Sequence, residues 1–318
     1  MAEIGKNIEF AVSVLSKGGL VAIPTETVYG LAANALDTGA VTRIYKVKRR
    51  PHFDPLIVHV KSSDDLGMYV KEVPDKARIL AETFWPGPLT LLLPKKEIIP
   101  DMVTSGLDSV GIRVPAHPLT LALLEKTGFP LAAPSANLFG YISPTSPDHV
   151  DSQLGDSIEY ILDGENCTVG IESTVIGFEN DTPTIYRLGG LSVEDIEKCI
   201  GPVIVRAHSV SDPRAPGMLK SHYAPSKKLL LGNIKELLQN QEGKSVGVIS
   251  FHKVIPGIDP GKQFLLSHSS SLEEAAGNLF RALRHMDALD IEVILAETVP
   301  EHGLGRAIND RLRRAAAE

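Results

Sequence analysis

The sequence has little cysteine and no long apolar run. Its 318 residues include two cysteines, Cys167 and Cys199, which are too few for a disulfide framework or for a zinc site of their own. The longest apolar runs, such as residues 89–93, are far shorter than a membrane-spanning helix requires. The N-terminal stretch MAEIGKNIEF lacks the basic, apolar, small-residue order of a secretory signal. We therefore expect a protein of the reducing cytoplasm with no part in a membrane.

The sequence also lacks the standard signatures of nucleotide and metal sites. It contains no Gly-x-Gly-x-x-Gly, His-Glu-x-x-His or Cys-x-x-Cys pattern. Gly243-Lys244-Ser245 resembles the end of a phosphate-binding loop, but Leu238 stands where the first glycine of that motif should be. We therefore expect no metal held by protein ligands alone. The formal charge of −7 means that a nucleic-acid partner would need a local basic patch.

The chain is long for a single hydrophobic core, and its composition changes along its length. In residues 1–205 short apolar runs mix with helical stretches, and strands often follow one another, which indicates an α+β domain. Residues 206–227 contain three prolines and many small polar residues, as is typical of a linker. In residues 228–318 predicted strands alternate with helices, which favours a smaller, Rossmann-like α/β domain with a parallel sheet.

Residues 22–35, AIPTETVYGLAANA, place polar side chains directly after a predicted buried strand. A plain turn would use glycine, asparagine or aspartate there. Ligands of α/β sheets bind beyond the ends of strands, so Thr25, Glu26 and Thr27 are predicted to border a substrate site. The small residues from Gly30 onward favour a helix after this polar stretch.

Polar side chains also stand at three other predicted element ends. They are Lys46, Lys48, Arg49 and Arg50 at the end of a predicted helix over 39–48, Ser135 and Asn137 after a strand, and Glu172, Ser173 and Thr174 at the start of a strand. The four cations could complement the helix dipole, but the loop that follows them favours a site for a polyanion. A capped turn would explain any one group alone. Their repetition indicates that they meet in one site.

Two further polar side chains lie inside apolar strands. Arg113 stands in VGIRVP, and a buried guanidinium must be paired with a carboxylate that the protein or a ligand supplies. His59 alternates with Val58 and Val60, so it is either a core histidine or part of the site. The buried Arg113 and the net acidity of the chain favour a small anionic ligand over a large nucleic acid.

Seven motifs, in order along the first two thirds of the chain, resemble the threonylcarbamoyl-AMP synthase family with its YrdC-like domain. They are PTETVYGLAANA, KVKRRPHFDPL, FWPGPLT, RVP, APSAN with the following SPT, IESTV and HYAP. The second predicted domain resembles the longer, two-domain form of the family. The resemblance implies a twisted mixed sheet around a basic cavity. It also implies that L-threonine, bicarbonate and ATP give L-threonylcarbamoyladenylate and pyrophosphate, and that a downstream transferase uses the product to modify adenosine 37 of tRNA.

The resemblance implies which residues hold the substrates. Those for threonine are Thr27, His59, Arg113, Ala133 and Ser173. Those for ATP are Lys48, Arg50, Asp54, Ser109, Ser135, Asn137, Ser143, Arg187 and Tyr223, with Lys48 and Arg50 as the catalytic cations. Mg²⁺ would enter with ATP rather than occupy a site of the protein. Asp54 departs from the family, which usually has asparagine there, and Glu26 is expected to orient backbone groups.

The linker is expected to close over the cavity as a lid. Gly217 offers a hinge, prolines stiffen the pieces on either side, and His222 and Tyr223 could reach the nucleotide. Two alternatives stay open. One is an RNA-binding module that uses the cations of residues 46–50, whereas contact with tRNA in the synthase would be indirect. The other is a carbamoyl-transfer hydrogenase maturation factor, whose Cys-x-x-Cys fingers this chain does not contain.

Overall fold

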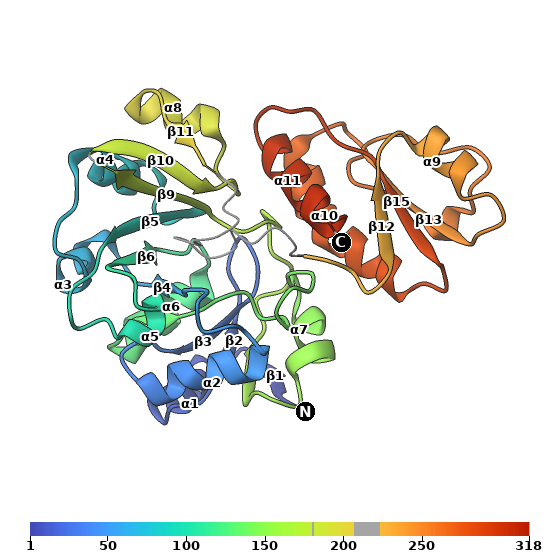
Figure 1. The fold of residues 1–318 in the computed structure, drawn as a ribbon. Helices are drawn as coiled ribbons and strands as arrows, with labels where there is room; N and C mark the ends of the chain where they lie inside the picture. The colour runs from blue at the N-terminus through green and yellow to red at the C-terminus, as the bar shows by residue number, and fades with distance from the viewer. Residues whose placement is uncertain (180, 207–222, 318) are drawn as a thin grey trace.

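The computed structural model describes residues 1–179, 181–206 and 223–317. These residues form a sheet of 11 strands and a sheet of four strands, which Figure 1 shows side by side. We call the elements from β1 to β11 the N-terminal domain and those from β12 to α11 the C-terminal domain. The predicted boundaries at 205 and 228 stay a prediction. Most of the predicted lid, including Pro213, Pro216, Gly217 and His222, lies outside the described residues.

The N-terminal domain is a mixed sheet with short helices. Its strands are β1 (Glu3–Gly5), β2 (Val21–Ile23), β3 (Gly30–Asn34), β4 (Ile57–His59), β5 (Leu89–Pro94), β6 (Ser109–Arg113), β7 (Leu131–Ala132), β8 (Tyr160–Leu162), β9 (Thr174–Glu179), β10 (Thr182–Arg187) and β11 (Ile204–Val205). Their order is β1-β8-β2-β3-β7-β4-β6-β5-β9-β10-β11. The helices are α1 (Ile8–Ser16), α2 (Thr38–Lys48), α3 (Leu66–Tyr69), α4 (Asp75–Phe84), α5 (Asp101–Thr104), α6 (Pro118–Thr127), α7 (Pro147–Leu154) and α8 (Val193–Ile200), with a 3-10 turn at Ser63–Asp65.

Residues 30–34 form strand β3, and not the helix that their small side chains predict. Gly30 pairs with Ile23 of the antiparallel neighbour β2, and Ala33 pairs with Ala132 of β7 on the other side. Hydrogen bonds to two neighbours and complete burial of Ala32 and Ala33 outweigh the helix propensity of alanine. Residues 24–29 therefore connect two adjacent strands, and their polar side chains lie at the end of the sheet.

The C-terminal domain is a parallel α/β unit, as the sequence predicts. Its strands are β12 (Lys228–Leu231), β13 (Val246–Ser250), β14 (Gln263–Leu265) and β15 (Val293–Ala296), in the order β12-β15-β13-β14. All three strand pairs are parallel. Its helices are α9 (Ile234–Asn240), α10 (Leu272–Ala288) and α11 (Gly305–Ala315), with a 3-10 turn at Pro260–Lys262.

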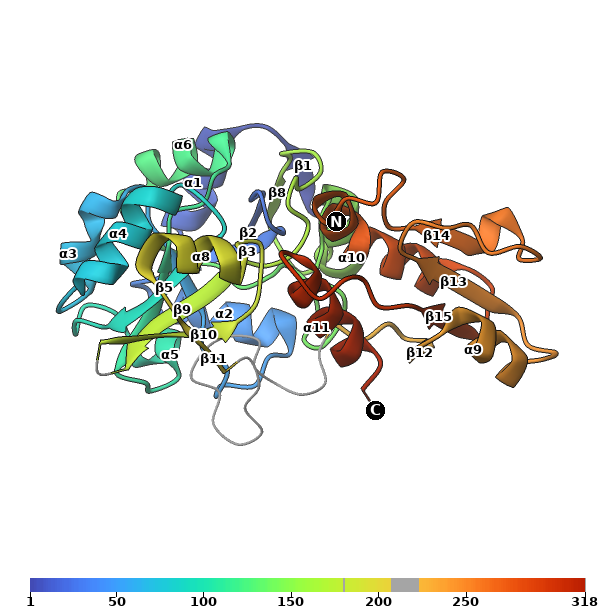
Figure 2. The same ribbon diagram turned by 90° about the horizontal axis from the view of Figure 1, so that it is seen from above.

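Helices α10 and α11 lie on the side of the small sheet that faces the N-terminal domain (Figures 1 and 2). One hydrophobic cluster includes Val28, Ile142 and Ile171 of the N-terminal domain together with Phe280 and Ile308 of these helices. The two domains therefore share part of a core. Within the described ranges, no helix combines the length and the apolar character that crossing a bilayer requires.

Candidate functional site

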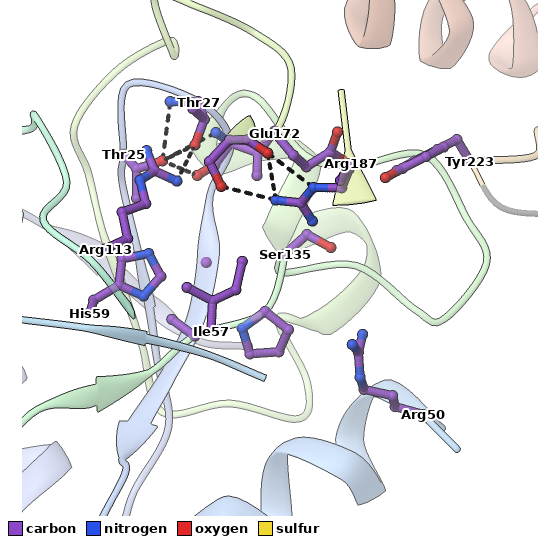
Figure 3. A pocket seen from close by; sticks show the side chains of 15 residues that line it. Thr25, Thr27, Arg50, Ile57, His59, Arg113, Ser135, Glu172, Arg187 and Tyr223 are labelled. Atoms are coloured by element: carbon purple, nitrogen blue, oxygen red, sulfur yellow. Dashed lines mark hydrogen bonds between the residues drawn. The ribbon is translucent and has the colours of Figure 1, made fainter. Parts of the chain in front are cut away.

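A pocket lies where the ends of several strands of the N-terminal domain meet. Its lining residues are Thr25, Thr27, Val28, Gly30, Arg50, Ile57, His59, Arg113, Ala133, Pro134, Ser135, Glu172, Ser173, Arg187 and Tyr223. All the residues expected to hold threonine are among them. Figure 3 shows Thr27, His59 and Arg113 on one side of the pocket and Arg50 and Tyr223 away from them.

Arg113 lies on the first of these sides, next to His59 of the parallel neighbour β4. Its Nη1 donates to Thr27 Oγ1 at 2.9 Å, and its Nε donates to the carbonyl of Gly87 at 3.2 Å. The carboxylate that a buried arginine requires belongs to Glu26, whose Oε1 is 2.7 Å from Arg113 Nη2. The other oxygen of Glu26 accepts a hydrogen bond from the backbone of Ala116, so this carboxylate orients both a cation and a loop.

The contact between Arg113 and Glu26 is close but poorly aligned. Neither Arg113 Nη2 nor Glu26 Oε1 has a hydrogen-bond partner among the described residues. A charge-assisted hydrogen bond needs alignment as well as short distance, and it weakens steeply when it is bent. The geometry therefore leaves one N–H group of Arg113 able to donate to a second carboxylate.

His59 forms part of the pocket wall rather than of the distant core. Burial, and after it the positive charge of Arg113, lowers the pKa of its imidazole to about 3. The ring is therefore neutral at physiological pH. It can donate or accept a hydrogen bond without bringing a charge to the pocket.

Ser173 and Arg187 form another part of the wall. Arg187 Nη2 donates to Ser173 Oγ at 2.9 Å and to the Ser173 carbonyl at 2.8 Å, while Ser173 Oγ shares a hydrogen bond of 2.7 Å with Thr90 Oγ1. Burial lowers the pKa of Arg187 to about 10, so the guanidinium is still charged near pH 7. The serine hydroxyl is thus held in one orientation by a buried cation.

The end of helix α2 separates two buried cations from two exposed ones. Arg49 adopts the left-handed conformation with φ 51, and its backbone caps the helix. The turn buries Lys48 and Arg50 and leaves Lys46 and Arg49 exposed. The cluster therefore does more than complement the helix dipole, because two of its charges lie inside the protein, where burial must be compensated.

Arg50 lines the pocket, whereas Lys48 lies just behind its wall. Lys48 is 1% exposed and its Nζ donates to the carbonyls of Ser135 and Asn137, both at 2.5 Å. Burial lowers the pKa of Lys48 well below its ordinary value, and the nearby Arg50 adds to this shift. In this conformation Lys48 therefore fastens the loop that carries Ser135 and Asn137.

Asp54 faces Arg50. Its Oδ2 is 2.8 Å from Arg50 Nη2, and Arg50 also donates to the carbonyls of Asp54 at 3.0 Å and of Pro55 at 2.8 Å. The guanidinium lies 5.9 Å from the ring centroid of Phe139. The carboxylate of Asp54 therefore neutralises part of the charge of Arg50.

Besides Lys48, four residues expected at ATP do not line the pocket: Asp54, Ser109, Asn137 and Ser143. Asn137 donates to the carbonyls of Leu138 and Tyr141, and Ser143 donates to Glu172 Oε1 at 2.5 Å, so both brace loops at the pocket edge. Ser109 lies at the opposite end of β6 from Arg113, in a different cavity. Its contact with ATP stays a prediction.

The sequence places Glu172 among the polar residues predicted to meet in one site, but the resemblance assigns it no contact with a substrate. The structure explains its presence, because Arg311 of helix α11 binds it. In the part of the chain that the structure describes, no group of three or more His, Cys, Asp or Glu side chains could hold a metal ion.

Comparisons with known proteins agree with this architecture over nearly the whole chain. Residues 13–189 match the Sua5–YciO–YrdC family model, which is described as telomere recombination. Residues 191–317 match the model of the threonylcarbamoyl-AMP synthase C-terminal domain.

Individual relatives cover both domains. The threonylcarbamoyl-AMP synthase of Pyrococcus abyssi is 47% identical over 97% of this chain and 94% of its own. That of Bacillus subtilis is 42% identical over 96% of this chain and 92% of its own. The crystal structure of P. abyssi Sua5 complexed with L-threonine has a TM-score of 0.91 at 45% identity, covering 99% of this chain and 97% of that one. This chain therefore belongs to the threonylcarbamoyl-AMP synthase family.

Proposed function

We propose that this pocket converts L-threonine, bicarbonate and ATP to L-threonylcarbamoyladenylate and pyrophosphate. The observation that carries the proposal is the convergence of three buried arginines, Arg50, Arg113 and Arg187, on one small pocket. Such a site suits reactants that carry several negative charges. The relative solved with L-threonine supports the identity of the amino acid.

The proposed chemistry brings two anions together. The amine of threonine attacks the carbon of bicarbonate, water leaves, and a carbamate forms. A carbamate oxygen then attacks the α-phosphorus of ATP, and the bond from that phosphorus to the β-phosphate bridging oxygen breaks as pyrophosphate leaves. The protein must hold both anions in line and stabilise the charge that develops, so positioning and fixed cations do most of the work. No covalent nucleophile is assigned.

On the threonine side, Arg113 would bind the carboxylate through the N–H group that is poorly aligned with Glu26. Thr27, His59 and Ser173 would contact the amine and the hydroxyl, and Ala133 would pack against the side chain. The neutral His59 supports this assignment, because it adds a hydrogen bond without competing for the carboxylate.

On the nucleotide side, Arg50 and Lys48 would bind the phosphates, with help from Asp54, Ser135, Asn137, Ser143, Arg187 and Tyr223. ATP would enter as its magnesium complex, so the metal is part of the substrate. The product would pass in the cytoplasm to a transferase that modifies tRNA, and this protein would need no direct contact with tRNA.

The direct test is to incubate the protein with ATP, Mg²⁺, radiolabelled bicarbonate and single amino acids. A labelled adenylate that requires both threonine and ATP is the expected product. Filter binding of tRNA at several salt concentrations tests the RNA-binding alternative beside it, because a phosphate-binding surface gives strongly salt-dependent affinity. Tight tRNA binding without any labelled adenylate would contradict the proposal.

Threonine should be strongly preferred among similar amino acids. Serine lacks the methyl group, which in an apolar pocket is worth roughly 1–3 kcal/mol, or about 10–200-fold in kcat/KM. Valine lacks the hydroxyl and would leave the polar groups of Thr27 and Ser173 without a partner, so it should react more slowly still. Pyrophosphate release with each amino acid measures the order, and equal rates for the three would mean that the pocket does not select threonine.

A further inference from the structure

Glu172 connects the pocket wall with the C-terminal domain. It lines the pocket, and its Oε1 accepts a hydrogen bond from Ser143 Oγ at 2.5 Å. Its Oε2 accepts two hydrogen bonds of 3.1 Å from Nε and Nη2 of Arg311. Arg311 lies on α11, the helix that faces the N-terminal domain in Figure 2, and its side chain is 0% exposed. The guanidinium of Arg311, from the C-terminal domain, therefore binds a residue of the pocket wall.

Arg311 also helps to cover Tyr223, another residue of the pocket wall. Its guanidinium lies 5.2 Å from the centroid of the Tyr223 ring, and that of Arg314 lies 4.8 Å from it. The ring of Phe280, on α10, is 5.5 Å from the same centroid. The ring of Tyr223 therefore packs against three side chains of the C-terminal domain.

The contact with Arg311 helps to keep the buried Glu172 ionised. The charged or titratable groups that face it are Arg187 from β10, Arg311 from α11 and the phenol of Tyr223, with the hydroxyl of Ser143 beside them. Burial on its own would raise the pKa of Glu172, but Arg311 and Arg187 together hold it below its ordinary value. Without Arg311 the carboxylate would lose two charge-assisted hydrogen bonds in a buried place, which is costly.

From these contacts we infer that Arg311 is a positioning residue of the active site. By binding Glu172 and packing on Tyr223, it fixes Ser143 and Tyr223 on the side of the pocket where the nucleotide binds. The C-terminal domain thereby supplies part of the ATP site, and does more than hold the linker. This inference rests on the proposed function.

One hydrogen bond between the domains lies away from the pocket wall. Tyr141 Oη donates to Asp287 Oδ2 at 2.7 Å, and neither residue lines the pocket. Tyr141→Phe removes this hydrogen bond between the domains and keeps the ring. It is therefore a matched control for a general weakening of the domain interface.

The test compares Arg311→Gln, Glu172→Gln and the double variant with the full-length wild type. Each single change should raise KM for ATP by roughly tenfold or more, since each breaks the buried ion pair between Glu172 and Arg311; in Glu172→Gln, Arg311 keeps Asp310 as its remaining carboxylate, at 2.8 Å. KM for threonine should change less than about threefold, because Arg311 acts on the nucleotide side. In the double variant, KM for ATP should rise by less than the product of the increases in the two single variants, because the two residues act as a pair.

A pH profile separates positioning from simple support of the fold. In Arg311→Gln the pKa of Glu172 should rise, so kcat/KM for ATP should fall as the pH is lowered toward that pKa and recover at higher pH. Wild type should show this acid limb only at lower pH, where Glu172 begins to be protonated. Variants with Glu172→Gln should lack the limb, because the amide does not titrate.

Three results would overturn the inference while wild type still makes the adenylate. They are an unchanged KM for ATP in folded Arg311→Gln, equal increases in KM for both substrates, and an equal loss of activity in Tyr141→Phe. If thermal unfolding shows that Arg311→Gln is not folded, Arg311→Lys replaces it in the test. Lysine keeps the positive charge but cannot form the two parallel hydrogen bonds, so a KM for ATP equal to that of wild type in this variant would contradict the inference. Failure of wild type to make any adenylate would instead contradict the proposed function.

Discussion

Arg50→Ala should lower the rate of pyrophosphate release by on the order of 100- to 1,000-fold, because it removes a fixed cation from the site of phosphate transfer. The guanidinium lines the pocket and is held by two backbone carbonyls and by Asp54. It is therefore oriented before ATP arrives, which is the condition under which a charge stabilises a transition state most effectively. The variant should fold, since Arg50 does not fill the hydrophobic core, but at a lower unfolding temperature, because the buried Asp54 loses this cation.

The neighbouring exposed cations give a matched control. Arg49 and Lys46 have the same charge and lie on the same helix end, but both point to solvent. Arg49→Ala and Lys46→Ala should keep pyrophosphate release within about twofold of wild type, because exposed charges are screened by water and salt. Near-normal release in Arg50→Ala would remove Arg50 from the catalytic machinery.

Lys48→Ala should lower the rate of pyrophosphate release as much as Arg50→Ala does, and two effects contribute to the loss. Lys48 Nζ binds the carbonyls of Ser135 and Asn137, so its loss frees a loop of the pocket as well as removing a charge. Each hydrogen bond to a charged group contributes roughly 1.5–3 kcal/mol, and we expect a lower unfolding temperature in this variant. Thermal unfolding with and without ATP distinguishes the two effects, since ligand binding stabilises only a competent site.

The pocket was predictable from the sequence because its residues stand at strand ends. Because strand ends meet at one edge of a sheet, the polar groups at residues 25–27, 135–137 and 172–174 were predicted to lie together at that edge. A buried arginine also demands a carboxylate, which pointed to a charged partner for Arg113 before its identity was known. The parallel sheet of the C-terminal domain followed from alternating strands and helices.

Other features depend on contacts that local sequence does not encode. Helix propensity favoured a helix from Gly30 onward, and only pairing with two neighbouring strands makes β3. The roles of Lys48 and Arg50 differ because one turn of backbone at Arg49 directs the first behind the wall and the second into the pocket. Arg311 is separated from Glu172 by 139 residues. No motif in the sequence predicts that a cation of the C-terminal domain contacts the pocket wall.

Arg113→Lys should raise KM for threonine by on the order of 100- to 1,000-fold, because a point-like ammonium cannot reproduce the planar fork that binds a carboxylate. Lysine keeps a positive charge near Glu26, so the variant should stay folded, whereas a neutral residue would leave Glu26 buried without its cation. KM for ATP should change less than about threefold. An equal increase in both KM values would mean that Arg113 supports the fold of the pocket rather than binding threonine.

Glu26→Gln should have the opposite effect and strengthen the binding of threonine. The carboxylate of Glu26 lies 2.7 Å from Arg113 Nη2, so a threonine carboxylate that binds the same guanidinium meets a like charge. The amide removes that repulsion but leaves Arg113 buried with less compensation. We therefore expect the free variant to unfold at a lower temperature than wild type, and saturating threonine to stabilise it by a larger shift than in wild type. A smaller shift than in wild type would mean that Glu26 orients Arg113 for the substrate instead of competing with it.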